Sequence, residues 1–121
     1  MAKLEQTFYG DFDDLLNRIE EGIQRGSSSA SLEDSSDFYA GDSRCSVRVF
    51  ERYSWSGGNR VRVYERYSAM GGNRVSLSVT LAGSGETLFV SAITSGGSQA
   101  MFFKVNTLGE ESFLDKLREL L

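Results

Sequence analysis

Residues 75–94 read VSLSVTLAGSGETLFVSAIT, and this stretch decides the fold. Its first half alternates apolar and hydroxyl side chains, which is the period of a strand with one buried face. The apolar members are Val75, Leu77, Val79 and Leu81. Residues 83–86, Gly-Ser-Gly-Glu, predict a turn, and residues 87–94 predict a second strand. Strands joined by so short a turn pair antiparallel, so the stretch predicts a hairpin with one face on the core.

Further strands are predicted on both sides of this hairpin. Residues 44–53 also alternate with period two: Val47, Val49, Glu51 and Tyr53 share one face, and Arg48, Phe50 and Arg52 share the other. The serine-rich, acidic residues 27–37 form either an edge strand or a loop, and we favour a weak strand. A turn around Gly41-Asp42 follows. The remaining predicted strands are residues 3–9 and 100–105, with a turn at residues 95–98 before the last.

Two amphipathic helices complete the predicted elements. Asp11 is placed to cap the first helix, and Gly26 to end it. Its apolar positions recur at helical spacing, at Phe12, Leu15, Leu16, Ile19 and Ile23. Thr107 and Glu110 have the form of a capping box before the closing helix. That helix carries an apolar stripe of Phe113, Leu114, Leu117, Leu120 and Leu121.

The order β-α-β(several)-α predicts an α+β fold in one domain, residues 1–121. The chain has 121 residues and a mass of 13.4 kDa, which fits one domain of ordinary size. We expect an antiparallel meander sheet with one solvated face. The two helices should then cover the other face.

An internal repeat lies in the middle of the chain. Residues 47–60 read VRVFERYSWSGGNR and residues 61–74 read VRVYERYSAMGGNR, with eleven of the fourteen positions identical and no spacer. Known solenoid repeats are longer and need several copies, so this pattern indicates a tandem duplication of one strand and its turn, natural or engineered. Fourteen is even, so downstream side chains keep their face of the sheet.

The duplication leaves three structural outcomes open. The sheet accepts an extra strand, one copy extends as a long hairpin, or the two registers compete and exchange strands between protomers. We favour the extended hairpin, with turns at residues 57–59 and 71–73, followed by dimerisation through it. The predicted partner is therefore a second copy, in a homodimer or a strand-exchanged oligomer.

Composition excludes several classes of site. The chain has no histidine, no proline and one cysteine, which removes a Ser-His-Asp triad, a Cys-His pair, a His-ligated metal site and an intrachain disulfide. No apolar run reaches the ~18–20 residues of a membrane span, and residues 1–10 lack the apolar region of a secretory signal. We expect a cytoplasmic protein with no cofactor, no metal and no membrane partner.

Charge is unevenly distributed within an acidic chain of net charge −4. Residues 1–43 carry −7 and residues 44–74 carry +5. We expect these arginines to pair with acids of neighbouring strands, such as Glu33, Asp34 and Asp37. A nucleic-acid partner is less expected, because nucleic-acid binders are usually basic overall. The Arg/Tyr-rich copies instead suit protein contacts. The candidate interaction surface consists of Arg48, Arg52, Tyr53, Trp55, Arg62, Tyr64, Arg66 and Tyr67.

Three other features are candidate sites of chemistry. Glu51 and Glu65 fall on the valine face of their copies, where a partly desolvated carboxylate suits a general base, unless an arginine or tyrosine on the next strand pairs with it. Arg44 and Arg48 lie near Cys45 in the sequence and would favour its reactive thiolate form. A lone cysteine at such a place is more often a small buried hydrophobic residue. Residues 95–99 favour a hairpin turn over an anion-binding loop. None of them predicts an enzyme.

Several stretches resemble a family of small bacterial proteins of unknown function. They are LEDSSDFYAGDSRCSVRVFERYS, GGNRVSLSVTLAG and FVSAITSGGSQAMFFKVNTLGEESFLDKLRELL. The resemblance covers nearly the whole chain and implies a small cytoplasmic α+β domain with one repeat unit where this chain has two. It implies no catalytic residues. The element order is also similar to helix-grip (START-like) folds, which often hold apolar ligands between sheet and helix.

Two functions follow as hypotheses. The first is a non-enzymatic interaction domain that self-associates through the duplicated hairpin. The second is a small carrier of an apolar ligand between the sheet and residues 113–121.

Overall fold

The structure is a computed structural model that describes residues 2–26, 30–53, 74–96 and 113–121. One long helix, α1, spans Phe12–Gly26, and a second helix, residues 113–120, closes the chain. The strands are β1 Ala2–Tyr9, β2 Ser31–Ala40, β3 Ser43–Tyr53, β4 Arg74–Ser84 and β5 Thr87–Gly96. The predicted α+β class with an N-terminal and a C-terminal helix is confirmed.

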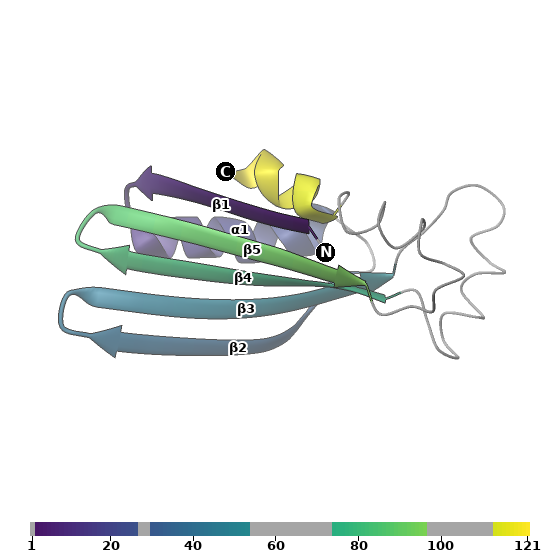
Figure 1. Ribbon diagram of the computed structural model, residues 1–121, viewed down its shortest axis with the longest axis horizontal. Helices are drawn as coiled ribbons and strands as arrows, with labels where there is room; N and C mark the ends of the chain where they lie inside the picture. The colour runs from purple at the N-terminus through teal and green to yellow at the C-terminus, as the bar shows by residue number, and fades with distance from the viewer. Residues whose placement is uncertain (1, 27–29, 54–73, 97–112) are drawn as a thin grey trace, which may run out of the picture.

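The five strands form one antiparallel sheet in the order β1-β5-β4-β3-β2 (Figure 1). Strands β2 to β5 follow one another as a meander, and β1 joins the far side by pairing with β5, from Ala2 opposite Thr94 to Tyr9 opposite Thr87. The turns between β2 and β3 and between β4 and β5 contain Gly41 at φ 57° and Gly85 at φ 61°. Glycine suits both places, because other residues rarely adopt a positive φ. The predicted turns at these two places are confirmed.

Both helices pack on the same face of the sheet. In Figure 1, α1 runs behind the strands, and the C-terminal helix lies close to β1. Gly22 of α1 contacts Leu120, so the two helices also touch each other. The side chains between helices and sheet are fully buried; the largest are Phe50, Phe113, Ile19, Ile23, Leu77, Leu81, Leu88, Leu114, Leu117, Val75, Val79 and Val90.

Helix α1 begins where the sequence predicts. The Asp14 amide donates a hydrogen bond to Asp11 Oδ2 at 2.9 Å, so Asp11 satisfies one of the amides that a helix start leaves unpaired. The helix ends at Gly26, and all five predicted apolar positions are buried in the core. In the closing helix, the stripe buries Phe113, Leu114 and Leu117, while Leu120 and Leu121 pack at the margin of the core.

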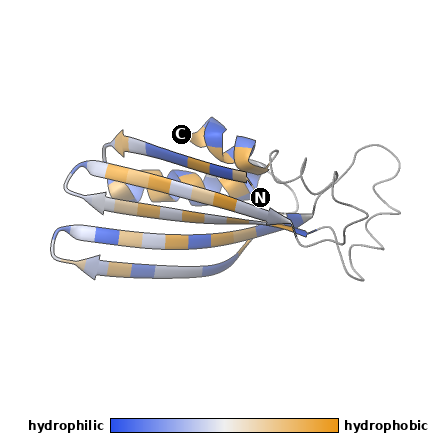
Figure 2. Ribbon diagram, viewed as in Figure 1, coloured by the Kyte–Doolittle hydropathy of each residue, from blue (hydrophilic) through white to orange (hydrophobic). Residues whose placement is uncertain are grey.

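Strand β4 has the alternation that identified the fold. Val75, Leu77, Val79 and Leu81 are buried beneath the helices, while the intervening hydroxyl residues lie on the opposite face. The apolar and polar bands of the sheet are visible in Figure 2. No described helix covers this second face. The serine and threonine side chains that β4 places there are therefore suited to contact with water.

Strand β3 turns its arginine face, not its valine face, toward the helices. Arg48 pairs in register with Val79, and Phe50 with Leu77, so these side chains share the buried face of β4. Val47 and Val49 are only partly buried on the open face. Glu51, a general-base candidate from the sequence, lies on this partly buried open face and not beneath the helices. Arginine can occupy the inner face because its aliphatic stem packs while its guanidinium reaches polar partners.

Residues 47–53 of the first repeat copy form the second part of β3, and residues 54–60 of that copy lie outside the described residues. The second copy contributes Arg74 to the start of β4, and its residues 61–73 lie outside the described residues. Glu65 and both predicted repeat turns also lie there, as do the predicted strand 100–105 and the capping box at Thr107.

Candidate functional site

The predicted interaction surface divides into a buried part and a part that is not described. Arg48 is 8% exposed beneath α1, and Arg52 is partly buried against the closing helix, so neither lies on an open surface. The backbone of Tyr53 ends β3. The other predicted members, Trp55, Arg62, Tyr64, Arg66 and Tyr67, lie outside the described residues.

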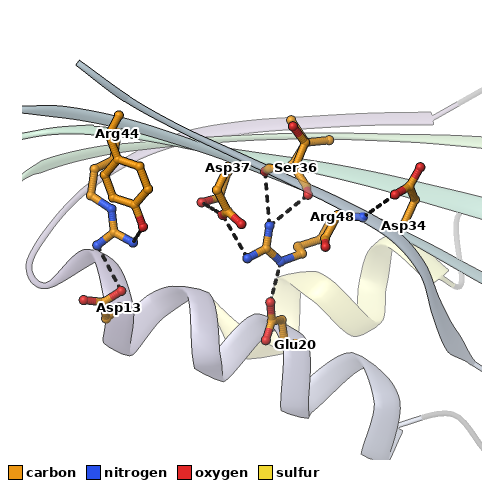
Figure 3. A network of polar contacts seen from close by, with 11 residues as sticks. Asp13, Glu20, Asp34, Ser36, Asp37, Arg44 and Arg48 are labelled. Carbon is orange, nitrogen blue, oxygen red and sulfur yellow. Dashed lines mark hydrogen bonds and ion pairs between the residues drawn. The ribbon is translucent and has the colours of Figure 1, made fainter.

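Arg48 is the centre of a polar network that ties three elements together (Figure 3). Its Nε donates a hydrogen bond to Glu20 Oε1 of α1, and its Nη2 lies 3.0 Å from Asp37 Oδ1 of β2. Its Nη1 donates to the Ser36 carbonyl at 3.2 Å. Asp37 also accepts a hydrogen bond from the Ser46 hydroxyl. The network joins α1, β2 and β3, and the Asp37 contact confirms one of the predicted arginine–acid pairs.

The network shifts the pKa values of Asp37 and Arg48 in the directions that favour their charged forms. The Ser46 hydroxyl and then Arg48 hold the pKa of Asp37 below its ordinary value. Burial alone lowers the pKa of Arg48, but the hydrogen bonds to Glu20 and Asp37 outweigh burial and raise it above its ordinary value. An arginine locked in its charged form between two carboxylates is a structural element and has no proton to exchange near neutral pH.

Arg44 has a similar anchoring role at the other end of β3. Its guanidinium lies 4.0 Å from the centre of the Phe12 ring and 4.9 Å from that of Tyr39. Its Nη1 lies 2.9 Å from Asp13 Oδ1. Arg44 thus joins the start of α1 to the β2–β3 hairpin through stacking and an ion pair.

Arg52 lies over the Phe113 ring of the closing helix, with 4.4 Å between its guanidinium and the ring centre. Burial lowers the pKa of Arg52. On the opposite face of β3, Glu51 Oε2 lies 3.2 Å from Arg74 Nη1 of β4. The alternative that an arginine of the next strand pairs with this carboxylate is therefore correct.

Sequence reasoning missed a groove on the open face. Four residues lie opposite one another across four strands: Phe38 of β2, Cys45 of β3, Ala82 of β4 and Phe89 of β5. Two phenylalanines thus stand on either side of two small residues. They line a cavity of about 440 Å³ that reaches the β2–β3 and β4–β5 turns. We call this cavity the phenylalanine groove.

The groove is exposed, because Phe38 is 66% and Phe89 39% accessible. Large apolar side chains left accessible on one face mark contact surfaces more often than scattered ones do. The only signal in the sequence was two phenylalanines at positions of the polar face, and seeing them as a pair requires the register of all four strands.

A second cavity lies at the C-terminal end of the chain. It measures about 150 Å³ and is lined by residues of β1, α1, β5 and the last turn, Leu15, Leu88 and Leu121 among them. Pockets for small molecules usually measure ~300–1,000 Å³. This cavity is thus small for the apolar ligand expected beneath the closing helix.

The described residues contain no cluster of three or more cysteine and carboxylate side chains able to hold a metal ion. Cys45 is a free thiol in the phenylalanine groove. Among the described helices, none is long and apolar enough to cross a membrane.

Comparisons with known proteins identify a family and show distant similarity to solved structures. The model of a family of unknown function, DUF6054, matches residues 1–62 and again residues 60–121. The two matches meet at the junction between the repeat copies. Among solved structures, the chain is similar to TTHA0849 from Thermus thermophilus, with 12% identity, coverage of 98% of this chain and 94% of that one, and a TM-score of 0.34. No curated protein matches.

Proposed function

Because the chain belongs to DUF6054, a family of unknown function, we propose its role from the geometry: it is a non-enzymatic interaction domain that associates with other copies of itself. The observation that carries this proposal is the phenylalanine groove on the uncovered face of the sheet. The groove has apolar walls and a small-residue floor, which suits an apolar side chain of a partner chain.

The non-enzymatic part of the proposal rests on how the polar residues are used. Arg48 forms ion pairs with both Glu20 and Asp37, and Glu51 pairs with Arg74. Among the charged groups singled out in the sequence, Arg48, Asp37 and Glu51 are thus engaged in pairs that hold elements together. The chain has no histidine, and the described general-base candidate, Glu51, is held in an ion pair.

The self-association part is supported by the repeat. One copy of the strand is enough to build β3, so the chain carries a second segment of the same strand-forming sequence. Domain swapping exchanges an identical element between protomers, and the second copy gives this chain a further strand-forming segment that can take part in such an exchange. We also propose that the protein is cytoplasmic, as the sequence predicts.

The carrier hypothesis remains the second candidate. It is supported by the cavity of about 150 Å³ beside Leu121, but the fully buried side chains between the helices and the sheet leave little space elsewhere in the described core. A carrier of this kind would hold only a small apolar group.

Native mass spectrometry over a concentration series tests the proposal. A dimer that grows with concentration and carries no added mass supports self-association. A monomer with a few hundred daltons of bound compound favours the carrier. A bare monomer at every concentration contradicts the self-association proposal.

A variant of the groove makes the test specific. Phe38→Ser should weaken dimerisation at least tenfold and leave the fold intact, because Phe38 is exposed. Tyr9→Ser is the matched control, since Tyr9 is 80% exposed and does not line the groove. The rate at which the Cys45 thiol reacts with an aromatic disulfide reagent should fall as the dimer forms. Equal weakening by both variants would argue against the groove.

A further inference from the structure

Strand β2 is an exposed edge of the sheet with a strong charge. Within the described strands it pairs with β3 alone, and all ten of its residues are exposed. It contains Glu33, Asp34 and Asp37 and no basic residue. The register shifts between Leu32 and Asp34, which sets Glu33 in a bulge. An edge strand has unpaired backbone groups on its outer side, so it can accept another strand.

The charge of β2 selects what can pair with it. Two β2 strands from two protomers would bring like charges together, which destabilises a strand pair. A strand carrying arginines would bring opposite charges together. Residues 60–67, RVRVYERY, contain three arginines and one glutamate and have the residue types that favour strands.

The structure already contains this pairing on the inner side of β2. Residues 47–51 of the first copy pair with β2 from Val47 opposite Ser36 to Glu51 opposite Ser31. Across this pair Arg48 reaches Asp37 at 3.0 Å. Residues 61–65 have the same sequence except that tyrosine replaces phenylalanine at position 64. The second copy therefore has the composition of a known β2 partner.

We propose that the outer edge of β2 receives residues 61–67 of a second copy of this chain, which extends the sheet across the two protomers. This inference rests on the proposed self-association and names its surface. Each protomer would give its second repeat copy to the β2 edge of the other, so the contact closes as a symmetric dimer.

The orientation of the added strand follows from the two faces of β2. The arginines of the added strand, like Arg48, belong on the helix face, where Asp37 lies; both contacts described for Asp37 use Oδ1. The valines then lie on the open face next to Phe38, whose side chain is 66% exposed. The side chains of β3 are distributed over the two faces in the same way. The added valines would complete the outer wall of the phenylalanine groove.

The second copy is a poor replacement for the first inside β3. A shift of fourteen residues would put Tyr64 at the fully buried position of Phe50 and Arg60 at the buried position of Ser46. It would also put Gly58 at the position of Arg44, and the contacts with Phe12 and Asp13 would be lost. The flanks of the first copy thus fit β3 better than those of the second.

The chain's own β2 edge is hard to reach for the same segment. Tyr53 and Arg74 pair at the end of the sheet where β2 begins. A seven-residue strand beside β2 measures about 20 Å, and its place lies roughly 14 Å from β4 across three strand spacings. In the antiparallel orientation that β3 shows, residues 54–60 would have to run from Tyr53 back along β2 and outward by two strand spacings, a path of roughly 22 Å that needs most of their full extension. A second copy meets no such limit.

A charge exchange tests the proposal on the full-length chain. One variant carries Arg62→Glu with Arg66→Glu, and another carries Glu33→Lys with Asp34→Lys. Each alone should raise the dimer dissociation constant at least tenfold in sedimentation velocity. Mixed in equal amounts, they should form a heterodimer, because both contacts again join strands of opposite net charge. Native mass spectrometry distinguishes the heterodimer by mass.

The control variant is Arg18→Glu with Arg25→Glu, which makes the same change of charge at exposed residues of α1. It should change the dissociation constant less than about twofold, and circular dichroism verifies the fold of each variant. A wild-type dimer that the Arg62 and Arg66 changes leave intact would overturn this inference and keep the proposed function. A wild-type chain that is monomeric throughout would overturn both.

Discussion

Gly83 of β4 lies against the ring of Phe12, so close that a Cβ atom at Gly83 would stand 2.8 Å from Phe12 Cδ2. Phe12 is buried, and Arg44 stacks on its ring at 4.0 Å, which limits its movement. Gly83→Ala should therefore lower the free energy of unfolding by about 1–3 kcal/mol, the usual cost of overpacking. Urea unfolding measures the change.

Gly22→Ala is the comparison for this prediction. Its added methyl group would meet the end of the Leu120 side chain, which is only partly buried near the chain end. In a helix interior, alanine is also more favourable than glycine by about 1 kcal/mol. The loss at Gly22 should therefore be clearly smaller than at Gly83. An equal loss at both positions would contradict the idea that the stacked Phe12 ring resists movement.

Replacement of Arg48 tests the network beneath α1. Arg48→Met keeps an apolar stem but leaves the Glu20 and Asp37 carboxylates without their arginine. Loss of one partner from a buried ion pair costs several kcal/mol, and the partial exposure of both acids reduces this to about 2–3 kcal/mol. Arg25→Met, at an exposed pair with Glu21, should cost less than about 0.5 kcal/mol. Chemical unfolding of the two variants compares them directly.

The stability of the chain should fall in acid through Asp37. The pKa of Asp37 in the fold is lower than its ordinary value of 3.8, so the ionised form stabilises the fold. This contribution is complete well above pH 3.8 and is lost as the pH falls through the lower folded pKa. The free energy difference between wild type and Asp37→Asn should thus be constant from about pH 7 to about 5 and shrink below about pH 4. Asp42→Asn, in the exposed β2–β3 turn, is the control.

Removal of either repeat copy tests which copy the core prefers. Deletion of residues 61–74 leaves Phe50 in β3, whereas deletion of residues 47–60 places tyrosine at the same buried position. Both proteins should fold, and the second should be less stable by about 1–3 kcal/mol, the cost of burying an unpaired hydroxyl. Phe50→Tyr in the full chain should show the same loss. A deletion of residues 61–74 that fails to fold would refute the view that one copy suffices.

Much of the fold was readable in the sequence because local patterns agreed with each other. The alternation of residues 75–81, the Asp11 cap and the stripe at residues 113–121 each specify an element without help from the rest of the chain. The weak strand at β2 was also correct, although all its residues are exposed. Its acidic composition is that of an edge, which the sequence also indicated.

The orientation of β3 was not readable, because valine alternates with arginine there and either residue can face inward. The orientation of β3 depends on residues distant in sequence. Glu20 of α1 and Asp37 of β2 supply the carboxylates that pair with Arg48 on the helix face. The phenylalanine groove was hidden for a related reason. Phe38 and Phe89 are 51 positions apart in sequence and become neighbours in space through a row of strand pairs.

The pairing of Tyr53 with Arg74 closes the β3–β4 hairpin at the outer end of the sheet, across twenty intervening residues. With one copy, six residues would close the same hairpin. The longer connection costs about 1 kcal/mol in closure entropy, because that cost grows only with the logarithm of length. This end of the sheet is thus a natural acceptor for inserted sequence. A peptide tag or reporter placed there should be displayed at little expense to folding, and new binding loops can evolve at the same point while the core is conserved.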